Sequence, residues 1–292
     1  MDFKNGQELL ELCKENNLPI SQIMKNREVT CGTLTEAEVD EKLKRVLEIM
    51  NDAVHIPLSR PVKSIGGLIG GEASKIVEFG KAPNNVCGSL LNKVTAYSMA
   101  VLEMNASMGL IVAAPTAGSS GVVPGVLLAL QEEKGLSDET LYAGLLNASA
   151  LGYILMRNAS VSGAEAGCQA EVGAASAMAA SAVVEMMGGT PEMCFHAASL
   201  ALSNLLGLAC DPIAGLVEAP CQSRNAIGAA NAITCAEIAL AGVPAIVPFD
   251  EMAEAMLRVG RSLPMEIRET ALGGSAGTPT GCALSCSICG GH

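Results

Sequence analysis

The chain has 292 residues, and its 18 basic and 30 acidic residues give a formal net charge of −12. This acidity argues against nucleic acid or an anionic membrane as a partner, because like charges repel. Half of the residues are hydrophobic, yet only 2% are aromatic and tryptophan is absent. A sequence dominated by Ala, Leu, Met and Gly favours closely packed helices over sheets rich in Val, Tyr and Phe. We therefore predict an all-α fold.

Eleven cysteines in a chain of this length would suit a secreted, disulfide-bonded protein. The amino-terminal stretch MDFKNGQELLELCKENN is, however, acidic and amphipathic and lacks the apolar core of a signal peptide. We therefore expect a cytoplasmic protein with reduced thiols and metal ligation.

One stretch, the 28 residues from Met104 to Gln131, carries no charge and is long enough to span a bilayer. Its centre, AAPTAGSSGVVPG, contains two prolines and a cluster of Gly and Ser. In lipid these residues would leave backbone groups without hydrogen bonds. We therefore predict a buried loop between two helices, and no membrane partner.

In chain order, the first expected element is a short amphipathic helix in a peripheral arm, residues 1–31. Thr35 and Glu38 then form a capping box. The helix that they begin carries an apolar stripe that we predict to face the core, made of Val39, Leu43, Val46, Leu47, Met50 and Val54. After it, the sequence GGLIGG at 66–71 predicts a loop whose backbone amides can approach a small anion closely.

The remaining sequence predicts a series of helices separated by Gly, Pro and capping residues. They cover residues 84–112, 122–135, 137–157, an Ala-rich run after Cys168, 191–208, a short helix between Asp211-Pro212 and Pro220, a run after Cys221, 250–259 and 264–272. A Cys-rich tail, 282–292, follows.

Three cysteines, Cys168, Cys210 and Cys221, stand at predicted turns at or near helix starts. A helix N-terminus lowers the pKa of a thiol, and thiolates are ligands of iron–sulfur clusters and of zinc. Three thiolates, unlike four, would leave one metal position open for substrate or water. Free cysteines are also often small buried hydrophobic side chains, and spacings of 42 and 11 residues leave both interpretations open.

The sequences SGAEAGCQAEVGAASAMAA, LACDPIAGLVEAPCQSRNAIGAANAI and PTAGSSGVVPGVL resemble the alpha chain of the bacterial iron–sulfur-dependent L-serine dehydratase. The resemblance extends over roughly residues 60–280. It implies that Cys168, Cys210 and Cys221 hold a [4Fe–4S] cluster whose open iron acts as a Lewis acid in converting L-serine to pyruvate and ammonia. We accordingly expect one compact catalytic domain, residues 32–281, with Gly-rich loops around a buried cluster.

Several polar residues near these motifs are candidates for binding L-serine. The resemblance places the Gly-rich loop beside the substrate, hydroxyl groups occur in the otherwise apolar PTAGSSG stretch, and an arginine can bind a carboxylate through two hydrogen bonds. The candidates are Lys63, Ser64, Gly66, Gly67, Thr116, Ser119, Ser120, Arg224 and Asn225.

The sequence does not identify the catalytic base. Glu171, three residues after Cys168, and His55 are candidates. In two-chain members of the family that this chain resembles, a beta subunit carries a Ser-rich motif ending in His, which is absent here. We therefore expect a beta subunit to supply the base or its support, in an oligomeric enzyme.

Other functions remain open at this point. The same cluster would suit a β-eliminase acting on cysteine or another small amino acid, a non-catalytic iron–sulfur subunit would need the same ligands, and zinc is a further possibility. The tail cysteines Cys282, Cys286 and Cys289 have the spacing of a radical-SAM motif, but no barrel follows it. Related dehydratases have a tail cysteine that occupies the open iron, and one of these three is a candidate for that position.

Overall fold

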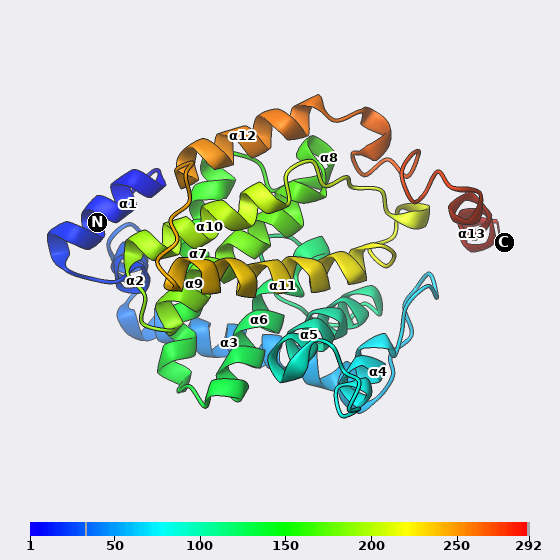
Figure 1. The fold of residues 1–292 in the computed structure, drawn as a ribbon, viewed down its shortest axis with the longest axis horizontal. Helices are drawn as coiled ribbons and strands as arrows, with labels where there is room; N and C mark the ends of the chain where they lie inside the picture. Colours follow the sequence, from blue (N-terminus) through cyan, green and yellow to red (C-terminus); the bar gives the residue numbers. More distant parts are fainter. Residues whose placement is uncertain (33, 291–292) are drawn as a thin grey trace.

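Helices cover most of the chain in the computed structural model, which describes residues 1–32 and 34–290. Within these ranges there are thirteen α-helices and no strand, so the all-α prediction is confirmed (Figure 1). The helices are α1 (Gly6–Asn16), α2 (Ile20–Thr30), α3 (Glu36–Ser59), α4 (Glu72–Phe79), α5 (Gly88–Ala106), α6 (Val122–Lys134), α7 (Asp138–Asn158), α8 (Gly163–Ala166), α9 (Ala174–Met186), α10 (Pro191–Asn204), α11 (Cys221–Leu240), α12 (Phe249–Ser262) and α13 (Pro279–Cys289).

Helix α9 lies at the centre of the fold and packs against α6, α7, α10 and α11. Its sequence, AASAMAASAVVEM, is apolar or small on every face, which is typical of a fully buried helix. All but one of its residues are buried. Small side chains let the neighbouring helices approach closely, and in Figure 1 α10 and α11 pass in front of α9. The predicted Ala-rich helix after Cys168 is therefore the core of the protein.

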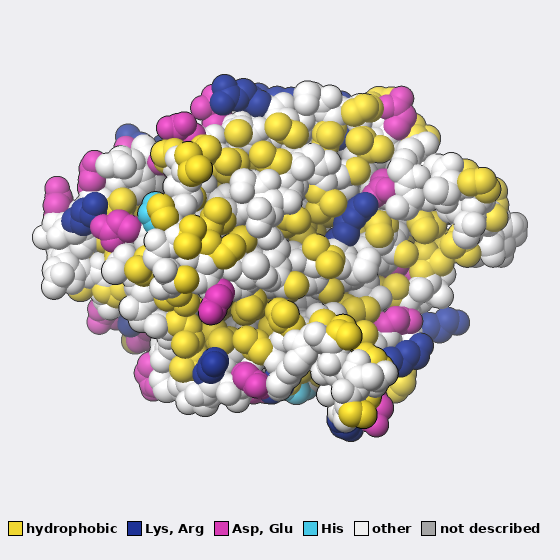
Figure 2. All heavy atoms as spheres, viewed as in Figure 1, with side chains coloured by type: hydrophobic (Ala, Val, Ile, Leu, Met, Phe, Trp, Pro, Cys, Tyr) yellow, Lys and Arg dark blue, Asp and Glu magenta, His cyan; other side chains and the backbone are white. Residues whose placement is uncertain are grey.

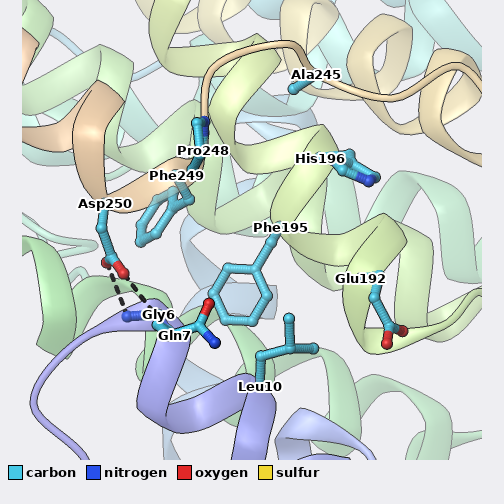
Figure 3. Close-up of a pocket in the computed structure, with 10 residues that line it drawn as sticks. All are labelled: Gly6, Gln7, Leu10, Glu192, Phe195, His196, Ala245, Pro248, Phe249 and Asp250. Atoms are coloured by element: carbon cyan, nitrogen blue, oxygen red, sulfur yellow. Dashed lines mark hydrogen bonds between the residues drawn. The ribbon is translucent and has the colours of Figure 1, made fainter.

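The N-terminal arm is bound to the rest of the chain at the first turn of α1. The Asp250 carboxylate accepts hydrogen bonds from the Gly6 and Gln7 amides, at 2.7 and 3.0 Å. Beside this contact, α1, α10 and α12 enclose a cavity of about 180 Å³ with mostly apolar walls (Figure 3). Its walls include Leu10, Phe195, His196, Pro248 and Phe249, and none of the three thiols highlighted above.

The first two helices also contribute to the core. The side chains of Phe3, Leu9, Ile20 and Ile23 have no exposed surface and belong to the same hydrophobic cluster as α9. Residues 1–31 therefore pack as part of the helical body.

The predicted start of α3 and the predicted loop after α5 are confirmed, although the loop is only partly buried, because Met108 and Leu110 are exposed. Thr35 Oγ1 accepts a hydrogen bond from the Glu38 amide, and Glu38 accepts one from the Thr35 amide. The uncharged stretch at 104–131 consists of the end of α5, a loop with one 3₁₀ turn, and most of α6. Helix α5 ends earlier than predicted because Met108 adopts a positive φ of 62°. In the described part of the chain, no helix combines the length and apolarity needed to cross a membrane.

Two predicted helices are wrong. Residues 211–220 contain only a 3₁₀ turn, Ile213–Gly215, and residues 264–272 only another, Met265–Ile267. The second segment instead bonds to Cys210, which donates its amide to Ile267 O and accepts from the Glu269 amide, while in the first segment the Ile213 amide donates to Ala219 O at 2.9 Å. Local propensity for a helix is weaker than these contacts between distant segments.

The tail contains a helix that the sequence analysis did not predict. Helix α13 begins at a Thr278 cap and packs against the 3₁₀ turn at Ile213–Gly215, where Ser285 Oγ accepts the Ala214 amide at 3.1 Å. It lies at one end of the molecule (Figure 1). Its three cysteines, Cys282, Cys286 and Cys289, are exposed.

Candidate active site around three buried thiols

Three separate segments bring Cys168, Cys210 and Cys221 together. Cys168 caps the π-helical turn that leads into α9, Cys210 lies in the extended segment after α10, and Cys221 is the first residue of α11. Their exposed fractions are only 4, 4 and 8%, and all three are free thiols. In addition to desolvation, the thiols of Cys168 and Cys221 help to raise the pKa of Cys210, and that of Cys221 helps to raise the pKa of Cys168, which indicates that the three thiols lie near one another.

The segment at Cys210 is held by backbone hydrogen bonds on both sides. The Cys210 amide donates to Ile267 O at 2.8 Å, and Cys210 O accepts from the Glu269 amide at 2.7 Å. Cys168 and Cys221 stand at helix starts, as predicted, whereas Cys210 does not.

Burial outweighs any influence of helix N-termini on these thiols. Desolvation, together with the nearby Glu171 carboxylate, raises the pKa of Cys168 and of Cys221 to about 12. Desolvation and then Cys168 also raise the pKa of Cys210. The prediction of lowered pKa values is therefore wrong for the metal-free chain. A bound metal reverses this effect, because a coordinating thiol is deprotonated.

Glu171 lies one turn beyond Cys168 and faces the thiols. Its carboxylate accepts a hydrogen bond from Thr116 Oγ1 at 2.7 Å and a weak one from Cys210 Sγ at 3.8 Å. Desolvation raises the pKa of Glu171, and the neighbouring Glu269 carboxylate adds to that effect. The structure thus groups Glu171 with the predicted metal ligands and with one predicted substrate residue.

Gly163 leaves room among these groups. A Cβ atom built on Gly163 would lie 2.6 Å from Glu171 Oε2, 2.9 Å from Cys210 Sγ and 3.2 Å from Glu269 Oε2. All three distances are shorter than ordinary van der Waals contacts, so any side chain here would have to displace the thiol or the carboxylates. The glycine therefore lets the Cys210 sulfur and the two carboxylates approach the backbone closely.

The PTAGSSG loop is joined to the start of α11 by Asn225. Its side chain accepts a hydrogen bond from the Gly121 amide at 3.0 Å and donates to Gly118 O at 2.8 Å and to Cys221 O at 2.9 Å. The Ser119 hydroxyl bonds to Thr116 Oγ1 at 3.1 Å and the Ser120 hydroxyl to a local carbonyl. Among the predicted substrate residues, Thr116 therefore contacts Glu171, Ser119 contacts Thr116, and Asn225 contacts the backbone of Cys221.

The Gly-rich loop binds an internal carboxylate. Glu218, which is buried, accepts hydrogen bonds from Ser64 Oγ at 2.7 Å, from the Gly66 amide at 2.6 Å and from the Leu68 amide at 2.8 Å. The Gly67 amide donates to Ser64 Oγ at 3.1 Å. The loop thus surrounds an anionic group as predicted, but that group is the side chain of Glu218, three residues before Cys221.

The two predicted basic residues differ in their surroundings. Arg224 is partly buried and donates through Nη1 to Ala209 O and to the Asp211 carboxylate. Lys63 is exposed, and no salt bridge to it occurs within the described residues. Burial disfavours the charge of Asp211, but the Ser275 amide and Arg224 together lower the pKa of that carboxyl.

His55 lies in another cluster, on α3. Its Nε2 is 3.4 Å from Glu132 Oε1 on α6, and its ring packs edge-on against Tyr97 with centroids 5.4 Å apart. The contacts of His55 are therefore with α5 and α6, and the candidate base nearest to the thiols is Glu171.

Sequence reasoning missed four residues of this site, which are Gly163, Asp211, Glu218 and Glu269. Glu218 and Asp211 stand close to a predicted ligand in sequence, which is a signal that could have been used. Glu269 gave none, because it reaches the site only through the pairing of its segment with Cys210 and through a positive φ of 65°.

The residues present fit a group bound by thiolates. Three buried thiols are the donor type of iron–sulfur clusters, and the absence of a side chain at Gly163 lets the Cys210 sulfur lie close to the backbone. Across the residues that the structure describes, no three His, Cys, Asp or Glu side chains are close enough to hold one metal ion. The fit therefore rests on the convergence of the three thiols and not on a preformed single-ion site.

The sequence is similar to known dehydratase chains over nearly its whole length. Residues 15–276 match the family model described as serine dehydratase alpha chain. The chain is 45% identical to a probable L-serine dehydratase alpha chain of Bacillus subtilis, covering 99% of this chain and 96% of that one. It is 44% identical to the L-serine dehydratase alpha chain of Peptoniphilus asaccharolyticus, covering 96% of each.

The chain is also similar to part of a longer L-serine dehydratase. The L-serine dehydratase TdcG of Escherichia coli is 34% identical over 94% of this chain, which spans 62% of that protein. This protein belongs to the serine dehydratase alpha chain family.

Proposed function

We propose that the protein is the alpha chain of an iron–sulfur-dependent L-serine dehydratase, which releases pyruvate and ammonia. The observation that carries this proposal is the convergence of three buried thiols from three segments in a chain of this family. Cys168, Cys210 and Cys221 would hold a [4Fe–4S] cluster. When bound, the cluster would supply a Lewis-acidic iron for the hydroxyl group of L-serine.

The residues of the chain itself have three tasks in this proposal. The thiolates hold the cluster, and the apolar helices around them exclude water. Thr116 Oγ1 donates to Glu171 Oε1 and so orients that carboxylate, whose other oxygen faces Cys210. Asn225 fixes the hydroxyl-bearing loop against the start of α11. These contacts orient the Glu171 carboxylate and the hydroxyl groups of the PTAGSSG loop, which would hold the substrate.

The catalytic base, or its support, comes from a partner beta chain in this proposal. The support is that an L-serine dehydratase such as TdcG contains considerably more sequence than this chain, which spans 62% of it. Of the two predicted candidates for the base, Glu171 contacts Cys210, while His55 contacts Glu132 and Tyr97. Activity should therefore rise strongly when the alpha chain is combined with a beta chain, and equal activity with and without it would contradict this part.

The first experiment is anaerobic purification with iron and sulfide analysis and an absorption spectrum with and without L-serine. We expect about four irons per chain, a brown protein, and a spectrum that L-serine perturbs. Values of kcat/KM for L-serine, L-threonine and L-cysteine then identify the substrate. A colourless protein that cannot be reconstituted with iron and sulfide would refute the cluster.

Single cysteine variants test the ligands. Cys168→Ser, Cys210→Ser and Cys221→Ser should each lose most of the iron. Cys235→Ser is the matched control, because Cys235 is also buried but lies in the second half of α11, bonded to Asn204 and Asn231. Iron loss in the control as well as in the three variants would show a general folding defect in place of ligation.

A further inference from the structure

Arg224 lies between two of the three proposed ligands. It is one helical turn after Cys221 on α11. Its Nη1 donates to Ala209 O at 2.8 Å and forms an ion pair with the Asp211 carboxylate. These two partners are the residues directly before and after Cys210. One guanidinium group thus joins the segment of one cysteine to the helix of another.

Asp211 extends the connection to a third segment. Its side chain is 4% exposed, and its second oxygen accepts the Ser275 amide at 2.5 Å. Gly274 has a φ of +57°, and a Cβ atom there would lie 2.2 Å from Asp211 Oδ2. Only glycine fits this turn without moving the carboxylate. The buried carboxylate is therefore held from two sides, by Arg224 and by the Gly-rich turn at 274–275.

We propose that Arg224 and Asp211 are positioning residues, which fix Cys210 relative to Cys221 so that both can bind the same cluster. The inference rests on the proposed function, and it assigns Arg224 a role different from binding the substrate carboxylate. A planar guanidinium can donate to a carbonyl and a carboxylate in a fixed geometry, whereas the flexible lysine ammonium cannot reproduce that geometry. Replacing Arg224 by lysine, which keeps the positive charge, should therefore not preserve cluster binding.

The test uses the full chain, reconstituted anaerobically with iron and sulfide, and compares Arg224→Lys and Asp211→Asn with the wild type. Arg258→Lys is the matched control, since Arg258 forms an exposed ion pair with Glu254 within α12. We expect both variants to retain less than half of the wild-type iron, with an altered absorption spectrum, while the control retains all of it. The helical circular dichroism of the metal-free variants should equal that of the wild type.

An unpaired buried charge can unfold a protein. The double variant Arg224→Met with Asp211→Leu removes both charges together, and we expect it to fold yet still to load poorly. Full iron loading by the folded Arg224→Lys or double variant would overturn the inference. An Arg224→Lys variant with full iron and a raised KM for L-serine would also overturn the inference, because that result is expected if Arg224 binds the substrate. Failure of the wild type itself to load iron would instead overturn the proposed function.

Discussion

The hydrogen bonds that Glu218 accepts from the Gly-rich loop make a prediction that can be worked out in energy. Glu218→Ala removes the acceptor of Ser64 Oγ and of the Gly66 and Leu68 amides, all at 2.6–2.8 Å. A hydrogen bond to a charged group contributes about 1.5–3 kcal/mol. The two amides are only half-buried, so water can replace part of this loss.

The three bonds sum to about 4.5–9 kcal/mol, and because water replaces part of the loss at the two amides we expect the free energy of opening this loop to fall by about 3 kcal/mol. That is less than the typical total stability of about 5–15 kcal/mol, so the chain should stay folded. Because about 1.4 kcal/mol corresponds to a factor of ten, amide hydrogen exchange at Gly66 and Leu68 should become roughly 100-fold faster.

The assay is hydrogen–deuterium exchange of a peptide that covers residues 62–71, in the wild type and in two variants. The control is Glu237→Ala, which removes an exposed carboxylate from α11 and should leave exchange at 62–71 unchanged. Unchanged exchange of this peptide in a folded Glu218→Ala protein would refute the reasoning. It would mean that the loop holds its conformation without the carboxylate.

Three further results are expected. Gly163→Ala should lower iron content, since its methyl group would overlap Cys210 Sγ and Glu171 Oε2, and undiminished iron would show that the thiol can move aside. Asp250→Ala should loosen α1 at a cost of about 1 kcal/mol and speed tryptic cleavage after Lys14, so an unchanged cleavage rate would count against the anchor. Iron-loaded protein should unfold at a higher temperature than metal-free protein, because the metal binds the folded chain, and equal melting temperatures would contradict that.

Much of the helical framework was predictable from local patterns. The capping box at Thr35 and the cap at Ser137 begin helices as expected, and Val39, Met50 and Val54 of the predicted stripe are buried. These features depend on hydrogen bonds and periodicity within a few residues. Helix starts and buried faces of this kind can therefore be predicted from the sequence alone.

The two helices predicted wrongly fail for different local reasons next to one long-range pairing. At 264–272 the Ile267 carbonyl and the Glu269 amide bond to Cys210, whereas at 211–220 the Ile213 amide closes a loop onto Ala219 O and Ala214 has a positive φ of 58°. Glu269 and Ala271 also adopt positive φ values of 65° and 56°. Such a pairing joins residues almost sixty positions apart, and no local pattern shows it.

The same limit applies to the candidate site, where the sequence showed hydrogen-bond donors but not what they donate to. The Gly-rich loop was predicted to approach a small anion and to lie beside the substrate, and Arg224 to bind a substrate carboxylate, because backbone amides and guanidinium groups attract anions. In the structure each of them binds a buried carboxylate of the chain, Glu218 or Asp211. A substrate carboxylate could use the loop donors or Arg224 Nη1 only by displacing one of those side chains, and the displaced carboxylate would then need a new partner. The two groups are therefore better suited to hold the segments around Cys210 and Cys221 than to bind substrate.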